Sequence, residues 1–272
     1  MNNSIDITTA EFDKIRAFVK SKVGISLSDQ KTSMVKGRLH KRLIELDMKS
    51  FEEYYKYLTS PNGDTEISNF INAISTNVTS FFRSPQHWQY LKDNLDDIFY
   101  SKKEKKLRIW SAACSSGEEP YSIIMFLKEN LRDFADWDIK ILATDISHKA
   151  LSKAMKAEYE QKDVGQMANW MLAKYFDKVG GAYKIKSELR QYITFRSFNL
   201  VNGDFYIFKN QFDIVFCRNV MIYFDMNTRK TLVSRFHKLL RKDGLLFLGD
   251  SEAIIENKSE FGFVKSSIYK PI

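Results

Sequence analysis

From residue 8 to residue 75 the apolar positions recur every three or four residues, the spacing that places them along one face of a helix. The first apolar stripe consists of Phe12, Ile15, Val19 and Val23. Thr8 or Thr9 followed by Glu11 is typical of a helix start, and Gly24 breaks the run. Further helices are predicted over about 28–48, from Ser50 to the turn at 61–63, and over 67–74. We therefore expect a small all-helical domain in residues 1–82.

Beyond residue 106 the spacing changes, and short apolar runs alternate with helical segments. Four runs have the length and the bounding turns of strands: 107–110, 139–143, 212–216 and 245–248. Helical patterns follow the first three, over 121–131, 149–158 and 227–240. This alternation indicates βαβ units and a mostly parallel sheet, so residues 107–272 are predicted to be an α/β domain that binds its ligand at the carboxyl ends of the strands. Residues 83–106 are expected to be a linker with a connecting helix.

The alternation is interrupted between residues 158 and 198. Gly180 and Gly181 separate two short segments rich in Tyr, Phe and Ile, which is typical of a hairpin. We expect a small antiparallel β-subdomain, inserted over about 160–195.

The composition is that of an ordinary globular protein, because 44% of the 272 residues are hydrophobic and 28% are charged. A disordered chain and a collagen-like repeat are therefore excluded. No apolar run approaches the roughly 18 residues that a membrane span requires. The polar first residues do not resemble a signal peptide, and Cys114 and Cys217 are expected to be small buried thiols in a reducing compartment. These features predict a cytoplasmic protein.

The net charge of +8 permits an anionic partner such as nucleic acid, but does not require one. Five basic side chains lie close together with no acidic residue between them: Lys31, Lys36, Arg38, Lys41 and Arg42. The run is either a solvated helix face or a docking surface for an acidic partner.

The segment from Trp110 to Tyr121 joins a predicted strand to a predicted helix. Small residues at 111–116 and Gly117 let a ligand approach the backbone closely. The segment is not a G-x-G-x-x-G turn and has no Walker lysine, and two acids at the helix start, Glu118 and Glu119, would repel a pyrophosphate. A cationic or polyhydroxylated ligand fits these residues better than a nucleotide phosphate.

Asp145 follows the next predicted strand, where an acid can accept both hydrogen bonds from a ribose diol. Alone, it is equally well interpreted as a helix cap; together with the preceding segment, the ribose interpretation leads. The third segment, residues 217–224, places Arg218, Asn219 and Tyr223 after the most apolar strand. It lacks the Pro-Pro-Tyr signature of amine methyltransferases, which argues against methylation of nucleic-acid bases. The fourth, residues 77–83, has two aromatics beside Arg83, and plain interdomain packing would explain it equally well.

Together these four segments resemble the CheR family, the glutamate O-methyltransferases of chemotaxis receptors. The resemblance runs from about residue 8 to residue 269 and is carried by N-x-T-x-F-F-R at 77–83, W-S-A-A-C-S-S-G-E-E-P-Y at 110–121, A-T-D-I at 143–146 and C-R-N-V-M-I-Y-F at 217–224. It implies a helical N-terminal domain and a class I (Rossmann-like) domain with the inserted β-subdomain. It also implies that the cofactor is S-adenosylmethionine (AdoMet), that S-adenosyl-L-homocysteine is the product, and that no metal takes part.

The resemblance assigns expected roles to individual residues. Asn77, Thr79 and Arg83 would lie near the methionine end of the cofactor and the reacting carboxylate. Glu118 would contact the amino-acid or ribose part of the cofactor, and Gly117 would belong to the same cofactor-binding turn. The ribose hydroxyls would be held by Asp145, the adenine flanked by Asn199 and Leu200, and the floor of the site lined by Arg218 and Asn219. Tyr223 would sit beside the transferred methyl group.

A glutamate carboxylate is already ionised at neutral pH, so this reaction needs neither a catalytic triad nor a metal. We expect Arg83 to fix the carboxylate through its planar guanidinium group, and Tyr223 to orient the carboxylate or the methyl group. The four histidines, at 40, 87, 148 and 237, are scattered without ligand spacing and are expected at the surface.

The resemblance also implies a partner, the acidic helical cytoplasmic region of methyl-accepting chemotaxis receptors, and makes the basic run at 31–42 its expected docking face. The hairpin around 179–182 is short, so we expect no binding of a receptor C-terminal pentapeptide. A monomer is expected, with recruitment to receptor arrays and without nucleic acid as a partner. The alternative is a non-catalytic AdoMet-binding scaffold of a receptor array.

Overall fold

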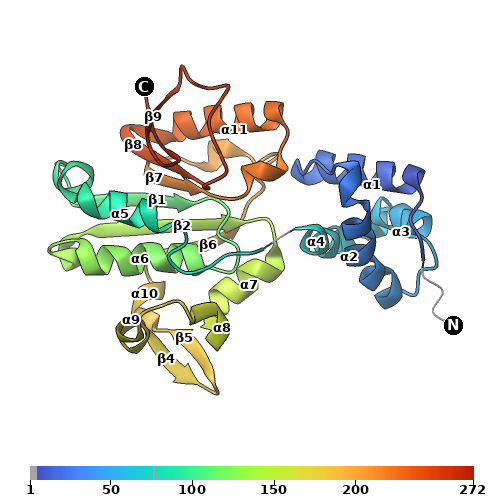
Figure 1. Ribbon diagram of the computed structural model, residues 1–272, viewed down its shortest axis with the longest axis horizontal. Helices are drawn as coiled ribbons and strands as arrows, with labels where there is room; N and C mark the ends of the chain where they lie inside the picture. Colours follow the sequence, from blue (N-terminus) through green and yellow to red (C-terminus); the bar gives the residue numbers. More distant parts are fainter. Residues whose placement is uncertain (1–4, 76) are drawn as a thin grey trace.

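The computed structural model describes residues 5–75 and 77–272 and places a helical domain beside a larger sheet domain (Figure 1). The helical domain consists of α1 (Thr9–Val23), α2 (Thr32–Glu45), α3 (Phe51–Leu58) and α4 (Asp64–Ile74). Its core contains the predicted apolar stripe of α1 together with Leu39, Leu43, Tyr54 and Phe70. The predicted start of α1 is confirmed: the Thr8 hydroxyl accepts from the Glu11 N–H, and the Glu11 carboxylate accepts from the Thr8 N–H.

The sheet domain is built on a seven-stranded sheet with the order β6-β2-β1-β7-β8-β10-β9. The strands are β1 (Lys106–Ser111), β2 (Asp138–Asp145), β6 (Ile193–Ser197), β7 (Phe212–Cys217), β8 (Leu240–Leu248), β9 (Phe261–Lys265) and β10 (Ile268–Pro271). The first five strands in this order are parallel to their neighbours, and β10 and β9 are antiparallel additions. The predicted α/β fold is confirmed. The strand order reverses direction between β1 and β7, and such a reversal opens a crevice at the carboxyl ends of the two strands.

Alternate residues of the central strands face two separate apolar cores. Ile214 and Phe216 of β7 belong to one core, with α6 (Glu118–Asn130); Val215 and Cys217 belong to the other, with α11 (Met226–Leu239). Segment 83–106, expected to be a linker with a connecting helix, contains a helix but packs as part of the sheet domain. Within it, α5 (Pro85–Asp93) and a π-helical turn (Asp96–Tyr100) bury three apolar side chains in the first core: Trp88, Leu91 and Phe99.

The inserted subdomain is a second, three-stranded antiparallel sheet with the order β3-β5-β4. Its strands are β3 (Glu158–Tyr159), β4 (Phe176–Val179) and β5 (Ala182–Ile185), and the short helices around them are α8 (Gln161–Val164), α9 (Asn169–Tyr175) and α10 (Ser187–Arg190). Gly180 and Gly181 form the predicted turn between β4 and β5, both with positive φ. The expected end of the insertion near residue 195 lies inside β6, which pairs with β2 in the large sheet.

The basic run at 31–42 is not a uniform surface. Arg42 makes two hydrogen bonds with the buried carboxylate of Glu66, at 2.9 and 2.6 Å, and Tyr54 donates to the same carboxylate. Burial disfavours ionisation of Glu66, but these hydrogen bonds and one from Asn69 outweigh it, so the pKa of Glu66 lies below its usual value. A lowered pKa means that the pair stabilises the fold above the unfolded pKa of about 4.3 and that this contribution is lost as the pH falls.

Two other members of the run also have partners within the helical domain. Arg38 donates to the Ile74 carbonyl at the end of α4, and Lys36 forms an ion pair with Asp6 at 2.9 Å. The members of the run that stay exposed are Lys31 and Lys41, of which Lys41 also lies 4.0 Å from the Glu45 carboxylate, so the docking surface expected from the sequence is reduced mainly to these two. In the described part of the chain, no helix is long and apolar enough to cross a membrane.

Candidate functional site

A cavity of about 420 Å³ lies at the carboxyl ends of β1, β2 and β7, within the size range of small-molecule sites. Both domains line it: Val23, Ile25, Leu27 and Met34 come from the helical domain, and Ala112, Ala113 and Phe198 from the sheet domain. Nine residues that the sequence predicted for the site line this cavity: Asn77, Thr79, Arg83, Asp145, Asn199, Leu200, Arg218, Asn219 and Tyr223.

The turn between β1 and α6 shows which of its residues reach the cavity. Gly117 and Glu118, both expected to contact a cofactor, are not among the described residues that line it. Gly117 has φ +97°, and a Cβ there would lie 2.9 Å from the Cβ of Ala154, so the glycine serves close packing of α6. The Glu118 carboxylate is buried and accepts from the Ser116 hydroxyl at 2.8 Å. Its neighbour Glu119 lines the cavity instead.

The Asp145 carboxylate accepts backbone hydrogen bonds from Ser115 and Ser147, both at 2.8 Å. Burial raises the pKa of Asp145 above its usual value, although the backbone hydrogen bonds favour the ionised form. The helix that follows, α7 (His148–Lys156), is capped by the Ser147 hydroxyl. Asp145 is therefore not the cap itself, and these backbone donors do not fill all of the roughly four acceptor positions of its carboxylate.

Glu119 and Arg218 form a buried ion pair at the point where the strand order reverses. Arg218 Nε donates to Glu119 Oε2 at 2.7 Å, and the Ser111 hydroxyl donates to Glu119 Oε1 at 2.6 Å. Arg218 Nη1 also donates to the backbone carbonyl of Arg83 at 2.7 Å. The pair thus joins the ends of β1 and β7 to the segment that carries Arg83.

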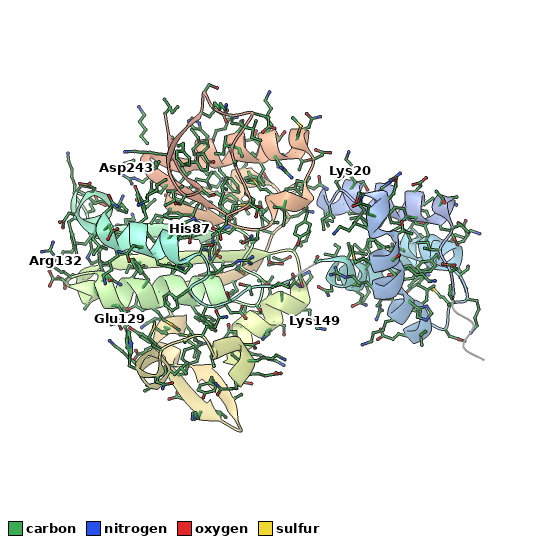
Figure 2. All side chains as sticks on the ribbon, viewed as in Figure 1. Lys20, His87, Glu129, Arg132, Lys149 and Asp243 are labelled. Atoms are coloured by element: carbon green, nitrogen blue, oxygen red, sulfur yellow. The ribbon has the colours of Figure 1, made fainter. Side chains whose placement is uncertain are left out.

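His87 corrects the expectation that all four histidines lie at the surface. It is fully buried, and it lies in the interior of the sheet domain in Figure 2. Its Nε2 is 2.8 Å from the carbonyl oxygen of Ser266, which can only accept, so Nε2 carries the proton. Nδ1 is then free to accept from Arg218 Nη1 at 3.4 Å. Burial lowers the pKa of His87, which keeps the ring neutral beside the guanidinium group.

The backbone around Arg83 is held in an unusual conformation. Phe82 and Ser84 both have positive φ, at +51° and +58°, which is rare for residues other than glycine. The Trp88 indole donates to the Arg83 carbonyl at 2.9 Å, and Arg83 Nη1 donates to the Val78 carbonyl at 3.0 Å. Strain of this kind persists only where the surrounding structure holds it, and here it brings the Arg83 side chain to the cavity wall.

The end of α1 docks on the sheet domain beside the cavity. The side-chain amides of Asn199 and Asn202 donate to the carbonyls of Lys22 and Ser21, each at 2.7 Å. Lys20, at the end of α1 that faces the sheet domain in Figure 2, forms an ion pair with Asp225 at 2.8 Å. These contacts satisfy carbonyls at the end of the helix, and they use the Asn199 side chain that was expected beside the adenine.

A backbone hydrogen bond continues this interface to Tyr223. The Ser26 N–H donates to the Tyr223 carbonyl at 2.7 Å, and Ile25 and Phe224 form an isolated antiparallel bridge. The helical domain therefore fixes the position of Tyr223 as well as lining the cavity.

Comparisons with known proteins agree with this geometry. Two family models cover almost the whole chain: "CheR methyltransferase, all-alpha domain" matches residues 10–75, and "CheR methyltransferase, SAM binding domain" matches residues 77–270. This chain belongs to the CheR methyltransferase family.

Individual relatives of this CheR-family chain are similar over nearly their full length. A protein of Borreliella burgdorferi named "Chemotaxis protein methyltransferase" is 36% identical, over 99% of this chain and 96% of its own. "Chemotaxis protein methyltransferase 2" of Pseudomonas aeruginosa is 37% identical over the same shares. The Escherichia coli protein "Chemotaxis protein methyltransferase" is 35% identical, over 99% of this chain and 93% of its own.

The residues of the cavity fit AdoMet, the methyl donor of the family. Asp145 and Glu119 place carboxylate oxygens at the wall, which can accept from the hydroxyl and amino groups of AdoMet, while the charge of Glu119 is balanced by Arg218. The side-chain oxygen of Asn219 is buried at the cavity and has no hydrogen-bond partner among the described residues. A buried acceptor of this kind is costly unless a ligand satisfies it. In residues 5–75 and 77–272, no group of three or more His, Cys, Asp or Glu is placed to hold a metal ion.

Sequence reasoning about this family member missed two parts of the site. Glu119 was noted only as a second acid at a helix start, and nothing local distinguishes it from Glu118; its partner Arg218 is 99 residues away. The lining residues of the helical domain were assigned only to its core. Their exposure to the cavity depends on how the domains dock, which no local pattern encodes.

The interface predicts the effect of replacing Gly24. Gly24 has φ +73°, and a Cβ there would lie 2.5 Å from Cγ2 of Val201. Gly24→Ala therefore strains the backbone and displaces the helical domain from its contact with the sheet domain. We expect the free energy of unfolding in urea to fall by about 1–3 kcal/mol, and the calorimetric Kd for AdoMet to rise several-fold.

Gly37→Ala is the matched control, because a Cβ on this residue of α2 meets nothing within 4 Å. It should leave AdoMet binding unchanged and stabilise α2 by roughly 0.5–1 kcal/mol. Wild-type affinity for AdoMet in Gly24→Ala would show that the docked helical domain does not shape the cofactor site.

Proposed function

We propose that this protein transfers the methyl group of AdoMet to glutamate side-chain carboxylates of chemotaxis receptors, forming glutamate methyl esters in the cytoplasm. The observation that carries the proposal is one cavity in which Asp145, an acceptor for ribose hydroxyls, lies together with Arg83, suited to a carboxylate. The names of the relatives, chemotaxis protein methyltransferases, support the same substrate. A non-catalytic scaffold would have no need for an arginine in a strained turn at the cofactor wall.

Bound AdoMet supplies an electrophilic methyl group on a positively charged sulfur and leaves as S-adenosyl-L-homocysteine. The acceptor carboxylate is ionised at neutral pH, so no residue of this chain has to remove a proton. The residues instead position the carboxylate. Such alignment lowers the activation barrier, because the orientational entropy is lost when the substrate binds and not in the reaction step. Arg83 holds the carboxylate through its planar guanidinium group, and Tyr223 orients the carboxylate or the methyl group.

Other lining residues hold the cofactor in this proposal. Asp145 accepts from the ribose hydroxyls with the lone pairs that its backbone contacts leave open. The orphaned oxygen of Asn219 accepts from a donor group of AdoMet. Asn77, Thr79 and Leu200 complete the wall. Glu119 takes the place that the sequence assigned to Glu118.

The decisive experiment incubates the chain with methyl-labelled AdoMet and a cytoplasmic receptor fragment. Label that is transferred to the fragment and released by mild base, as from an ester, supports glutamate methylation. AdoMet binding in calorimetry without any transfer would favour the scaffold instead.

Arg83→Ala tests the role of the guanidinium group. We expect kcat for the receptor fragment to fall by about 100-fold or more, because the carboxylate loses its alignment. Arg83→Lys should recover little of the rate, since a lysine cannot reproduce the planar fork. Full turnover by Arg83→Ala with AdoMet still bound would refute the role.

The docking surface is tested by substitutions at two adjacent residues, Lys41 and Arg42, which have different environments in the structure. Lys41 is 82% exposed and should meet an acidic receptor helix, so Lys41→Glu is expected to lower kcat/KM for the receptor fragment several-fold at low salt, with the AdoMet Kd unchanged. The difference should shrink as salt is added.

Arg42→Glu, by contrast, should act on stability, because it leaves the carboxylate of Glu66 buried without its cation. Urea denaturation should show a loss of about 3–5 kcal/mol. Equal kcat/KM for wild type and Lys41→Glu at low salt would argue against docking at this surface.

A further inference from the structure

The buried carboxylate of Glu252 lies next to the backbone of segment 219–222 and has no role in the proposed reaction. Only 5% of the residue is exposed, and none of the ion pairs in the described part of the chain includes it. Three backbone N–H groups donate to it instead: Gly249 at 2.6 Å and Asn219 at 2.8 Å to Oε2, and Ile222 at 3.1 Å to Oε1. A buried charge without a cation is retained only where such hydrogen bonds stabilise it.

Two of these donors belong to the turn that carries Tyr223. Asn219 has φ +59°, a left-handed conformation that needs support in a residue other than glycine, and its N–H is bound to Glu252. Ile222 immediately precedes Tyr223. Gly249 leaves room for this arrangement, because a Cβ there would lie 2.7 Å from Glu252 Oε2 and 2.8 Å from the Asn219 nitrogen.

The same loop also reaches the turn that carries Arg83. Asp250 accepts from the Ser84 hydroxyl at 3.0 Å and from the Gln86 side-chain amide at 2.5 Å. Ser84 has positive φ and directly follows Arg83. The loop 249–252 therefore contacts both turns that bring the proposed catalytic side chains to the cavity.

We propose that Glu252 and Asp250 are positioning residues, which set the separation of Tyr223 and Arg83 by holding their two backbone turns to one loop. Glu252 acts only through backbone N–H groups, so it needs two accepting oxygens; a glutamine would turn an amide N–H₂ toward a donor. Asp250 faces one hydroxyl and one amide, and an asparagine can satisfy both because a hydroxyl also accepts. This positioning role depends on the proposed function only in the choice of the receptor fragment as the substrate of the assay.

The test compares E252Q, D250A and D250N with wild type and with D213N. Asp213 is the matched control, a buried carboxylate at the opposite end of β7 that accepts from Lys102 and from the Arg108 N–H, both at 2.7 Å. Turnover of the receptor fragment is measured at a temperature well below each Tm, together with the calorimetric Kd for AdoMet. Amide hydrogen exchange of segments 82–86 and 219–224 is followed by mass spectrometry without any receptor.

We expect kcat of E252Q to fall by more than about fivefold and exchange in segment 219–224 to accelerate, since small misplacements of aligned groups are costly. D250A should lose more than about twofold in kcat, and D250N should restore it. D213N should lower Tm while its kcat stays within about twofold of wild type and its exchange in segment 219–224 is unchanged.

A kcat for E252Q within about fivefold of wild type overturns the proposal. If E252Q is not recovered folded, the comparison of D250A with D250N tests the proposal instead, and equal kcat values for these two variants overturn it. Absence of turnover by the wild-type chain would contradict the proposed receptor substrate, and hydrogen exchange would then decide the positioning role. Unchanged exchange of segment 219–224 in E252Q would overturn the positioning role. If E252Q is not recovered folded, unchanged exchange around residue 84 in D250A would overturn it.

Discussion

The buried ion pair between Glu119 and Arg218 is the interaction on which the rest of the site depends. It lies where the strand order reverses, and it connects the end of β1, the start of α6 and the end of β7. Arg218 extends the connection to the carbonyl of Arg83. Two buried charges are expensive to take out of water, and their attraction compensates only when the remaining donors and acceptors are also satisfied. Ser111, the Arg83 carbonyl and the neutral ring of His87 meet that condition.

The second constraint is that the cavity is completed by the helical domain. The Asn199 and Asn202 amides hold the end of α1, and the bond from Ser26 to Tyr223 ties the proposed catalytic turn to the same domain. If the receptor docks on the helical domain as proposed, its carboxylate lies close to the proposed cofactor cavity. In the proposed reaction, which requires no acid or base from the protein, this arrangement gives the two interlocked domains a shared task, the positioning of the cofactor and the acceptor.

Most elements of the fold follow from local pattern, and the failures concern a short strand, the packing of one helix and charged residues whose partners are distant in the sequence. Thr8, Glu11 and Gly24 mark the ends of α1 as predicted, because capping depends on neighbouring residues. The edge strand β6 was missed because Ile193–Ser197 is short and includes exposed polar residues. Segment 83–106 was predicted to be a linker with a connecting helix; the helix is α5, but its Trp88 and Leu91 belong to the main core. The charged residues were the hardest: whether Arg42 faces a receptor or Glu66, and whether Glu118 or Glu119 meets Arg218, is decided by partners far away in the sequence.

The most direct measurement of the central claim is a double-mutant cycle on the ion pair, with AdoMet binding as the readout. Glu119→Gln, Arg218→Gln and the double variant are titrated with AdoMet by calorimetry, alongside wild type. If the pair assembles the cofactor wall as one unit, each single variant should lose most of the AdoMet binding free energy that the double variant loses. The coupling free energy between the two substitutions should then exceed about 1 kcal/mol. Losses that add to within about 0.5 kcal/mol would show that the two side chains act independently and would contradict the account.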